Sequence, residues 1–304
     1  MSKIIKVGYC VAYDWEYLKI ALPLIYKSAD LICLSIDINR KTWVGNKYEI
    51  DNNAFHNFVF TIDTHKKIEI YEDDFYIPSN TAMQNEVRQR KLIAEKMGKG
   101  GWHIQLDTDE YFLDFDKFVN YLLKIEKNPS GKKRPINIKA NWIPIIKQLN
   151  NGFLYVDFED KLGETFSVAT NCPKYLNGRN NDYFNILSPF YCIHQTQARS
   201  PEDLKLKLNN WGHSDNELKQ LEVRESLFNL WNTIDEFNYN RIKNCHFTNP
   251  KTWPALHYVK AKNINELIQN IKQPKFPLSN IQLKLKNSIW YSRLSKIFPF
   301  LQIK

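Results

Sequence analysis

The run WHIQLDTDEYF at residues 102–112 constrains the fold more than any other part of the chain. Its apolar start is typical of a buried strand, and the acids Asp107, Asp109 and Glu110 follow at once. On an extended backbone, side chains two residues apart point to the same side, so Asp107 and Asp109 lie together. Two adjacent carboxylates repel unless a cation lies between them. Hard divalent cations such as Mg²⁺ or Mn²⁺ prefer oxygen ligands and are often shared with phosphates, so the pattern favours a metal–phosphate site over two solvated acids in a turn.

Strand-like and helical runs alternate around this motif. Residues 4–12 and 30–37 predict buried strands, and residues 80–97 predict a capped helix that ends before a glycine turn. This order predicts an α/β fold with a mostly parallel central sheet. Ligands of such sheets bind beyond the carboxyl ends of the strands, which is where Asp37 and the acids of 107–110 lie.

The second half of the chain changes character. Strand-like runs continue to about residue 196, helical runs follow, and residues 216–304 predict a helical, basic extension. From Leu267 to Lys304 the chain contains no acid, and basic residues alternate with apolar and aromatic ones. The segment 281–304 can therefore lie on an anionic bilayer surface or pack on the domain as a C-terminal helix, and both interpretations stay open.

Composition narrows the class of protein. With 43% hydrophobic and 14% aromatic residues, the chain can bury a substantial core. The formal net charge is +9, but no zinc-finger spacing or RNA-recognition signature occurs, so we expect no nucleic-acid partner. Five widely spaced cysteines without a CxxC pair favour free thiols in a reducing compartment. No apolar leader and no run of about 18 apolar residues occurs, so we expect a cytoplasmic protein, peripheral at most on the inner face of a membrane.

Three blocks of the sequence carry a family resemblance: VGYCVAYDWEYLKIAL at 7–22, NEVRQRKLIAEKMGKGGWHIQLDTDEYF at 85–112 and IHQTQARSPEDLKLKLNNWGH at 193–213. Together they resemble glycosyltransferases of the GT-A fold, in the family-two-like group of bacterial and viral sugar transferases. The resemblance implies a Rossmann-like GT-A domain over 1–215, with a nucleotide-sugar half (1–125) and an acceptor half (126–215). It implies a hexosyltransferase-type enzyme of polysaccharide biosynthesis, which moves a sugar from a nucleotide-diphosphate donor to a hydroxyl of a glycan or glycolipid with Mn²⁺ or Mg²⁺.

The resemblance also implies which residues form the donor site. Asp107, Asp109 and His194 would ligate the metal. The donor itself would contact six residues, which are Asp37, Asn85, Arg88, Asp107, Arg199 and Lys207. Arg199 and Lys207 would neutralise the leaving diphosphate. Asn85 and Arg88 are three residues apart and so share one face of a helix, either facing the nucleotide or forming a solvated surface.

Two features depart from the family pattern. Val11-Ala12-Tyr13-Asp14 follows the first strand in place of the usual Pro-Thr-Tyr-Asn, and the Glu-Asp pair that often supplies a general base has no clear counterpart. An inverting transfer needs a carboxylate that deprotonates the acceptor hydroxyl. Asp160 and Glu164 are the candidate catalytic residues, with solvated loop acids as the alternative.

Other functions share parts of this pattern. A phosphatase-like hydrolase also ends a strand with Asp-x-Asp, but usually near the N-terminus and with Thr or Val where Tyr111 stands. A nucleotidyltransferase would carry a Gly-Ser pair before the motif, and none is present. A non-catalytic nucleotide- or glycan-binding module is the third alternative. For the transferase, we expect Asp109→Ala to abolish turnover and leave the fold nearly intact, because it relaxes a repelling pair.

Overall fold

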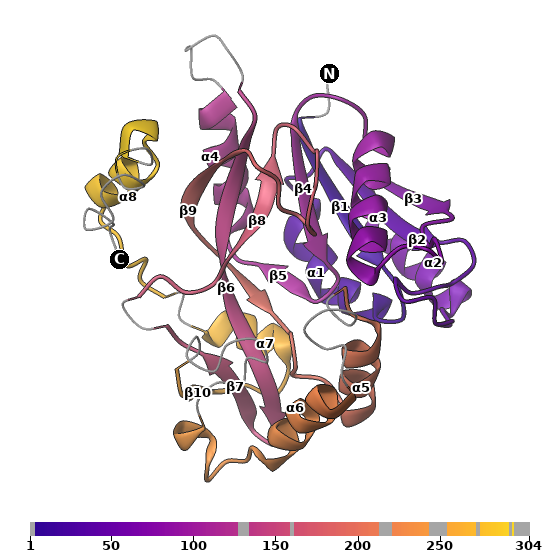
Figure 1. The fold of residues 1–304 in the computed structure, drawn as a ribbon, viewed down its shortest axis with the longest axis vertical. Coiled ribbons are helices and arrows are strands. Elements are labelled where there is room, and N and C mark those ends of the chain that lie inside the picture. Colours follow the sequence, from indigo (N-terminus) through magenta and orange to yellow (C-terminus); the bar gives the residue numbers. More distant parts are fainter. Residues whose placement is uncertain are drawn as a thin grey trace.

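The protein is an α/β structure built on one large mixed sheet, seen in a computed structural model (Figure 1). The structure describes residues 4–126, 134–158, 161–212, 221–242, 254–271, 274–291 and 294. All statements about the structure below concern these residues.

Four parallel strands form the N-terminal half of the sheet. They lie in the spatial order β3-β2-β1-β4, with bounds β1 (Ile5–Val11), β2 (Leu31–Asp37), β3 (Ile68–Asp73) and β4 (Trp102–Asp107). β1 and β2 are buried along their whole length. Their near-continuous apolar sequence follows from this position, because a parallel strand is covered on both faces. The predicted parallel sheet is confirmed for this half.

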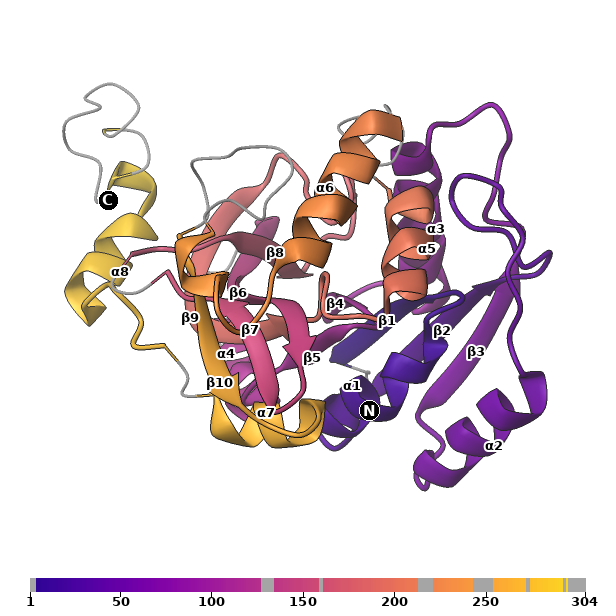
Figure 2. The same ribbon diagram turned by 90° about the horizontal axis from the view of Figure 1, so that it is seen from below.

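Helices cover both faces of the parallel strands. The helical segments are η1 (Trp15–Tyr17), α1 (Leu18–Tyr26), α2 (Asn52–Ile62) and α3 (Ala82–Lys96). α3 lies on one face, and α1 and α2 lie on the other (Figure 2). α3 is capped, as predicted, and the cap is a capping box in which Thr81 and Gln84 bond each other's backbone N–H groups.

The sheet continues beyond β4 with strands that run in both directions. These are β5 (Glu110–Phe112), β6 (Ile136–Leu149), β7 (Gly152–Val156), β8 (Thr165–Thr170), β9 (Phe184–His194) and β10 (Leu256–Lys260). The path across the sheet is β10-β7-β6-β8-β4-β1-β2-β3, and β9 pairs with both β6 and β5. β8 is antiparallel to β4 and to β6, whereas β9 is parallel to β6. The central strands are thus mostly parallel, as predicted, and the strands beyond β4 make the whole sheet mixed.

The later helices surround this second half. They are α4 (Phe115–Glu126), α5 (Pro201–Asn210), α6 (Leu221–Thr233), the 3₁₀ helix η2 (Tyr239–Arg241), α7 (Ile264–Asn270) and α8 (Asn280–Lys286). Only helices were expected after residue 215, but β10 pairs antiparallel with β7 and joins the sheet. Leu256 is the buried residue of this short strand, and the other four residues are half-buried or exposed, so no continuous apolar run indicates it in the sequence.

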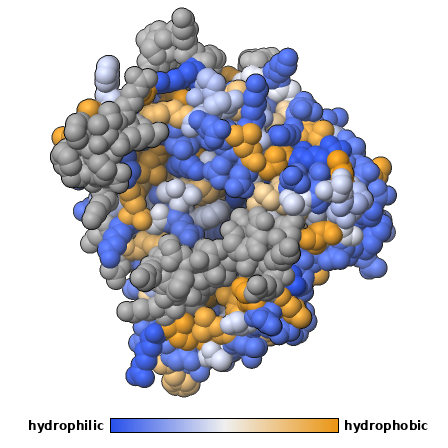
Figure 3. All heavy atoms as spheres, viewed as in Figure 1, coloured by the Kyte–Doolittle hydropathy of each residue, from blue (hydrophilic) through white to orange (hydrophobic). Residues whose placement is uncertain are grey.

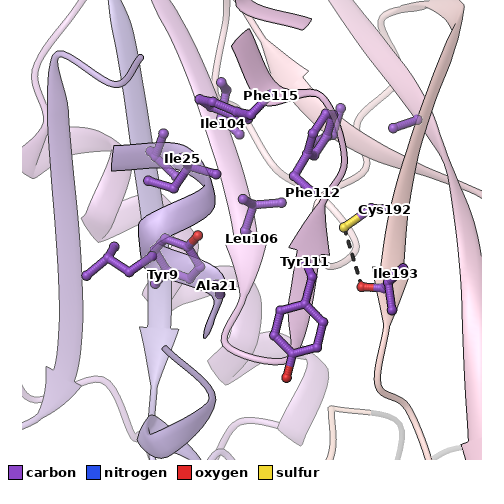
Figure 4. Packing of buried hydrophobic residues seen from close by; sticks show 14 of the residues in the cluster. Tyr9, Ala21, Ile25, Ile104, Leu106, Tyr111, Phe112, Phe115, Cys192 and Ile193 are labelled. Carbon is purple, nitrogen blue, oxygen red and sulfur yellow. Dashed lines mark hydrogen bonds between the residues drawn. The ribbon is translucent and has the colours of Figure 1, made fainter. Parts of the chain in front are cut away.

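One hydrophobic core connects the two halves. Tyr9 from β1, Ala21 and Ile25 from α1, and Tyr111 and Phe112 from β5 point into it (Figure 4). Cys192 and Ile193 from β9 border the same cluster. The expected donor half and acceptor half therefore share a core, and they do not form separate folding units.

No helix among the described residues is long and apolar enough to cross a membrane. The face of the molecule over α3 is mostly hydrophilic (Figure 3). The free thiols of the described part are Cys10, Cys33, Cys172 and Cys192.

Candidate functional site

A pocket opens where the carboxyl ends of β1, β2 and β4 meet. The register pairs Cys10 with Asp107, so the residues after β1 lie beside the acids after β4. The pocket is lined by acids, by the cations of two lysines, and by aromatic rings. Its lining comprises Cys10, Val11, Ala12, Tyr13, Asp14, Asp37, Lys41, Thr42, Trp43, Tyr48, Glu86, Gln89, Asp107, Thr108, Asp109, His194, Lys207, Asn210 and Trp211. This is the edge of the sheet at which the sequence predicts a ligand site.

Asp109 lines this pocket and has two cations on the same oxygen. Its Oδ2 accepts hydrogen bonds from Arg199 Nη2 at 2.5 Å and from Lys207 Nζ at 2.7 Å. Arg199 Nη2 also lies 3.4 Å from Oδ2 of Asp14. Burial alone would raise the pKa of Asp109, but Lys207 and Arg199 hold it well below its usual range. The carboxylate therefore stays ionised, and both cations are held in place.

Asp107 has a different set of partners. Its Oδ1 accepts from Arg90 Nη2 at 2.7 Å, and its Oδ2 lies 3.4 Å from Arg179 Nη2. Arg179 in turn donates to both oxygens of Glu110, at 2.6 and 2.7 Å. Burial opposes ionisation of Asp107, yet Arg90 and Arg179 lower its pKa to about 2. The sequence suggested that Asp107 and Asp109 share one cation. In the structure they do not, because each has its own pair of basic side chains.

His194 reaches the site through the pairing of β5 with β9. The register places His194 opposite Glu110, which is the residue that follows Asp109. His194 Nε2 lies 3.7 Å from Asp109 Oδ1, and its ring lies against Trp142 with ring centres 4.9 Å apart. Burial lowers the pKa of His194 to about 3, against the opposing effect of Asp109. The imidazole is therefore neutral near pH 7, and the contact with Asp109 is not an ion pair.

The side chains around the motif do not fit the expected Mn²⁺ or Mg²⁺ site. Within the described ranges, no group of three or more His, Cys, Asp or Glu side chains is placed to hold a metal ion. Asp109 and His194 come nearest to one, but Lys207 and Arg199 already bond the carboxylate. At an effective dielectric of about 20, unit charges about 4 Å apart interact by about 4 kcal/mol, and a divalent ion doubles this. At similar distances, two fixed cations would therefore repel a divalent ion more strongly than one carboxylate attracts it.

Asp37 lines the pocket but is bonded by the backbone. Its Oδ1 accepts from the N–H groups of Asn39 and Lys41, both at 3.0 Å. Its Oδ2 accepts from the N–H groups of Phe75 and Tyr76 at 3.0 and 3.3 Å. These bonds hold together the loops that follow β2 and β3, so Asp37 shapes the pocket wall.

The other helix residues expected to contact the donor face elsewhere. Asn85 is fully buried and bonds the backbone of Ile77 and Trp43. Arg88 donates to the carbonyl oxygen of Asp74 and lines a separate surface hollow. The residues of α3 that meet the pocket or its acids are Glu86, Gln89 and Arg90. The structure thus brings Asp37, Asp107, Asp109, His194 and Lys207 to the pocket, places Arg199 behind Asp109, and leaves Asn85 and Arg88 away from it.

Of the two candidate bases, the structure describes Glu164 alone. Asp160 lies outside the described residues. Glu164 lies just before β8, where its carbonyl oxygen accepts from the Trp142 N–H at 2.9 Å, and it does not line the described pocket.

Several residues of the site were not predicted. Arg90 lies one turn after Glu86 and bonds it, a spacing that is visible in the sequence. Arg179 lies in a loop between β8 and β9, where no periodic pattern indicates its role. Trp43 and Tyr48 come from the loop after β2 and give the pocket flat apolar surfaces.

Comparison with models of known protein families and with the curated proteins gives no match. The chemistry of the site is therefore inferred from its geometry. Its ammonium groups can donate to an anion, and the aromatic rings beside them can contact a planar group.

Proposed function

We propose that the protein is a glycosyltransferase that moves a sugar from a nucleotide-diphosphate donor to a hydroxyl of a glycan or glycolipid. One observation carries the proposal. The pocket beyond β1, β2 and β4 brings strand-end acids together with Lys207, 98 residues later in the chain, and with aromatic rings. The resemblance of three sequence blocks to GT-A glycosyltransferases supports the same function.

The arrangement of strands supports a Rossmann-like GT-A fold as part of this proposal. Four parallel strands lie in the order β3-β2-β1-β4, and β8 continues the sheet in the antiparallel direction. A donor nucleotide in such a sheet binds beyond the carboxyl ends of the parallel strands.

Each part of the pocket has a role in this reaction. The rings of Trp43 and Tyr48 offer surfaces on which a nucleobase can stack. The bond between the sugar and the diphosphate breaks, and its electron pair stays with the diphosphate. The acceptor oxygen bonds the sugar carbon and releases its proton to a carboxylate or to water. Lys207 stabilises the charge that develops on the departing diphosphate.

The alternatives receive less support from this geometry. A hydrolase with an aspartate nucleophile needs a carboxylate free to attack, whereas Asp107 and Asp109 are each bonded by buried basic side chains. A non-catalytic module would bind a nucleotide without breaking the donor. Donor hydrolysis therefore separates a module from a transferase.

A ligand screen tests the proposal. We expect at least one nucleoside diphosphate to raise the melting temperature, because a ligand at about 100 times its dissociation constant stabilises the folded state by about 2.7 kcal/mol. Each compound is measured with and without Mn²⁺, and a panel of nucleotide sugars is then assayed for donor hydrolysis and transfer. The absence of any shift across the panel in both conditions would refute the proposed function.

A further inference from the structure

The two cations on Asp109 come from one short segment of the chain. Arg199 directly precedes Ser200, which caps the N-terminus of α5, and Lys207 lies in the last turn of that helix. Both side chains are buried, with 1% and 10% of their surface exposed. Because both bond the same carboxylate oxygen, docking of α5 fixes their positions before any ligand binds.

Both cations keep donors that the described protein does not use. An ammonium group carries three N–H donors. Among the described residues, Lys207 gives one of them to Asp109, and its side chain lines the pocket. Arg199 lies against the ring of Tyr17, and its Nε and Nη1 bond no described residue. At the place where the motif was expected to bind a metal, Lys207 therefore offers the pocket an ammonium group with unused donors, and Arg199 lies behind Asp109.

We propose that this pocket binds the diphosphate of its donor through Lys207, supported by Arg199, in place of a divalent metal ion. The proposal rests on the proposed function and specifies how the donor is bound. In this arrangement Asp109 is a positioning residue, which bonds Lys207 at the pocket and opposes the lowering of the lysine pKa by burial. A fixed cation that is already desolvated stabilises the charge of a diphosphate without reorganisation.

Binding measured by calorimetry tests the proposal on the full chain. Nucleoside diphosphates are titrated in the presence of EDTA and again with Mn²⁺. We expect the same affinity in both conditions. Loss of a hydrogen bond to a charged group costs enough to weaken binding about tenfold or more, so Lys207→Met should weaken it by that factor in EDTA. Lys205→Met is the matched control, because Lys205 lies on the same helix, is exposed, and faces Phe228.

The outcomes separate this inference from the proposed function. Binding that requires Mn²⁺ would overturn the inference and leave the transferase proposal standing. No binding with or without Mn²⁺ would refute both. Equal binding in EDTA by Lys207→Met and wild type would also overturn the inference. Lys207→Arg keeps a positive charge beside Asp109, so partial retention of affinity in that variant shows that a loss in Lys207→Met reflects charge rather than a failure to fold.

Discussion

Asp109 holds two buried basic side chains, and this changes what its removal does. Without the carboxylate, Arg199 and Lys207 remain buried with one fewer counter-charge. Breaking a buried ion pair by removing one partner costs about 3–5 kcal/mol, so Asp109→Ala should lower the free energy of unfolding by that amount. The expected near-intact fold of this variant does not agree with the ion pairs in the structure.

Urea unfolding of Asp109→Ala and wild type measures this difference. Asp182→Ala is the control, because Asp182 is exposed and should change stability by less than about 0.5 kcal/mol. Equal loss in the two variants would contradict the structural role of Asp109.

Asp107 predicts how stability depends on pH. Its pKa in the folded protein is about 2, because Arg90 and Arg179 outweigh the effect of burial. An unfolded aspartate has a pKa of about 4, so the carboxyl stabilises the fold above that value and loses the effect as the pH falls toward 2. The difference in unfolding free energy between wild type and Asp107→Asn should therefore shrink from pH 5 to pH 3. A constant difference over this range would contradict the assignment.

The acids of the site were predictable at this scale, and their partners were not. Asp107 and Asp109 follow an apolar run, which is a local signal. Arg179 is separated from Glu110 by 69 residues, and only the folded chain brings them together. The pair Asn85 and Arg88 has the same helical spacing as Glu86 and Gln89, so periodicity alone does not tell which face meets the pocket.

The position of α3 over the sheet depends on a glycine in β1. A Cβ atom at Gly8 would lie 2.5 Å from Cγ2 of Ile93, so alanine forces the helix outward. Overpacking of this kind costs about 1–3 kcal/mol, and Gly8→Ala should lower the free energy of unfolding by that amount. Because α3 also carries Arg90, the same shift should disturb the contact with Asp107.

A double-mutant cycle identifies the cause. Ile93→Leu removes the methyl group that the new Cβ would meet. The loss caused by Gly8→Ala should therefore be smaller in the Ile93→Leu background than in wild type. If the effects of the two substitutions on the free energy of unfolding simply add, the contact with Ile93 is not the reason that position 8 needs glycine.

At the scale of the whole molecule, the C-terminal part is continuous with the sheet. β10 pairs with β7, and Trp231 of α6 donates from its indole N–H to the carbonyl oxygen of Ile146 at 2.8 Å. Contacts of this kind cross the expected boundary at residues 215 and 216. They join segments 85 residues or more apart, for which the sequence gives no local signal. β1 and β2 were predictable because burial on both faces leaves a near-continuous apolar run, whereas β10 is short and only Leu256 in it is buried.

The C-terminal segment carries the last prediction, which concerns membrane contact through residues 281–304. α8 is bonded to β9 through Asn287, whose side chain bonds both the N–H and the carbonyl of Leu187. Its outer side chains are exposed: the accessible fraction of the surface is 72% for Ile281, 49% for Leu285 and, just beyond the helix, 75% for Trp290. Basic residues occupy its last turn. Apolar and basic side chains on one surface segment favour binding to an anionic bilayer.

Replacing these three apolar residues by serine should therefore reduce co-sedimentation with anionic vesicles by about tenfold or more, since each contributes buried apolar area. Phe60→Ser is the matched control, because Phe60 is an exposed apolar residue on α2, with 86% of its surface accessible. Vesicles of neutral lipid should bind wild type weakly, since the basic residues then lose their counter-charge. Equal binding of anionic vesicles by the triple-serine variant and wild type would mean that these side chains do not enter the bilayer, and that the segment packs on the protein instead.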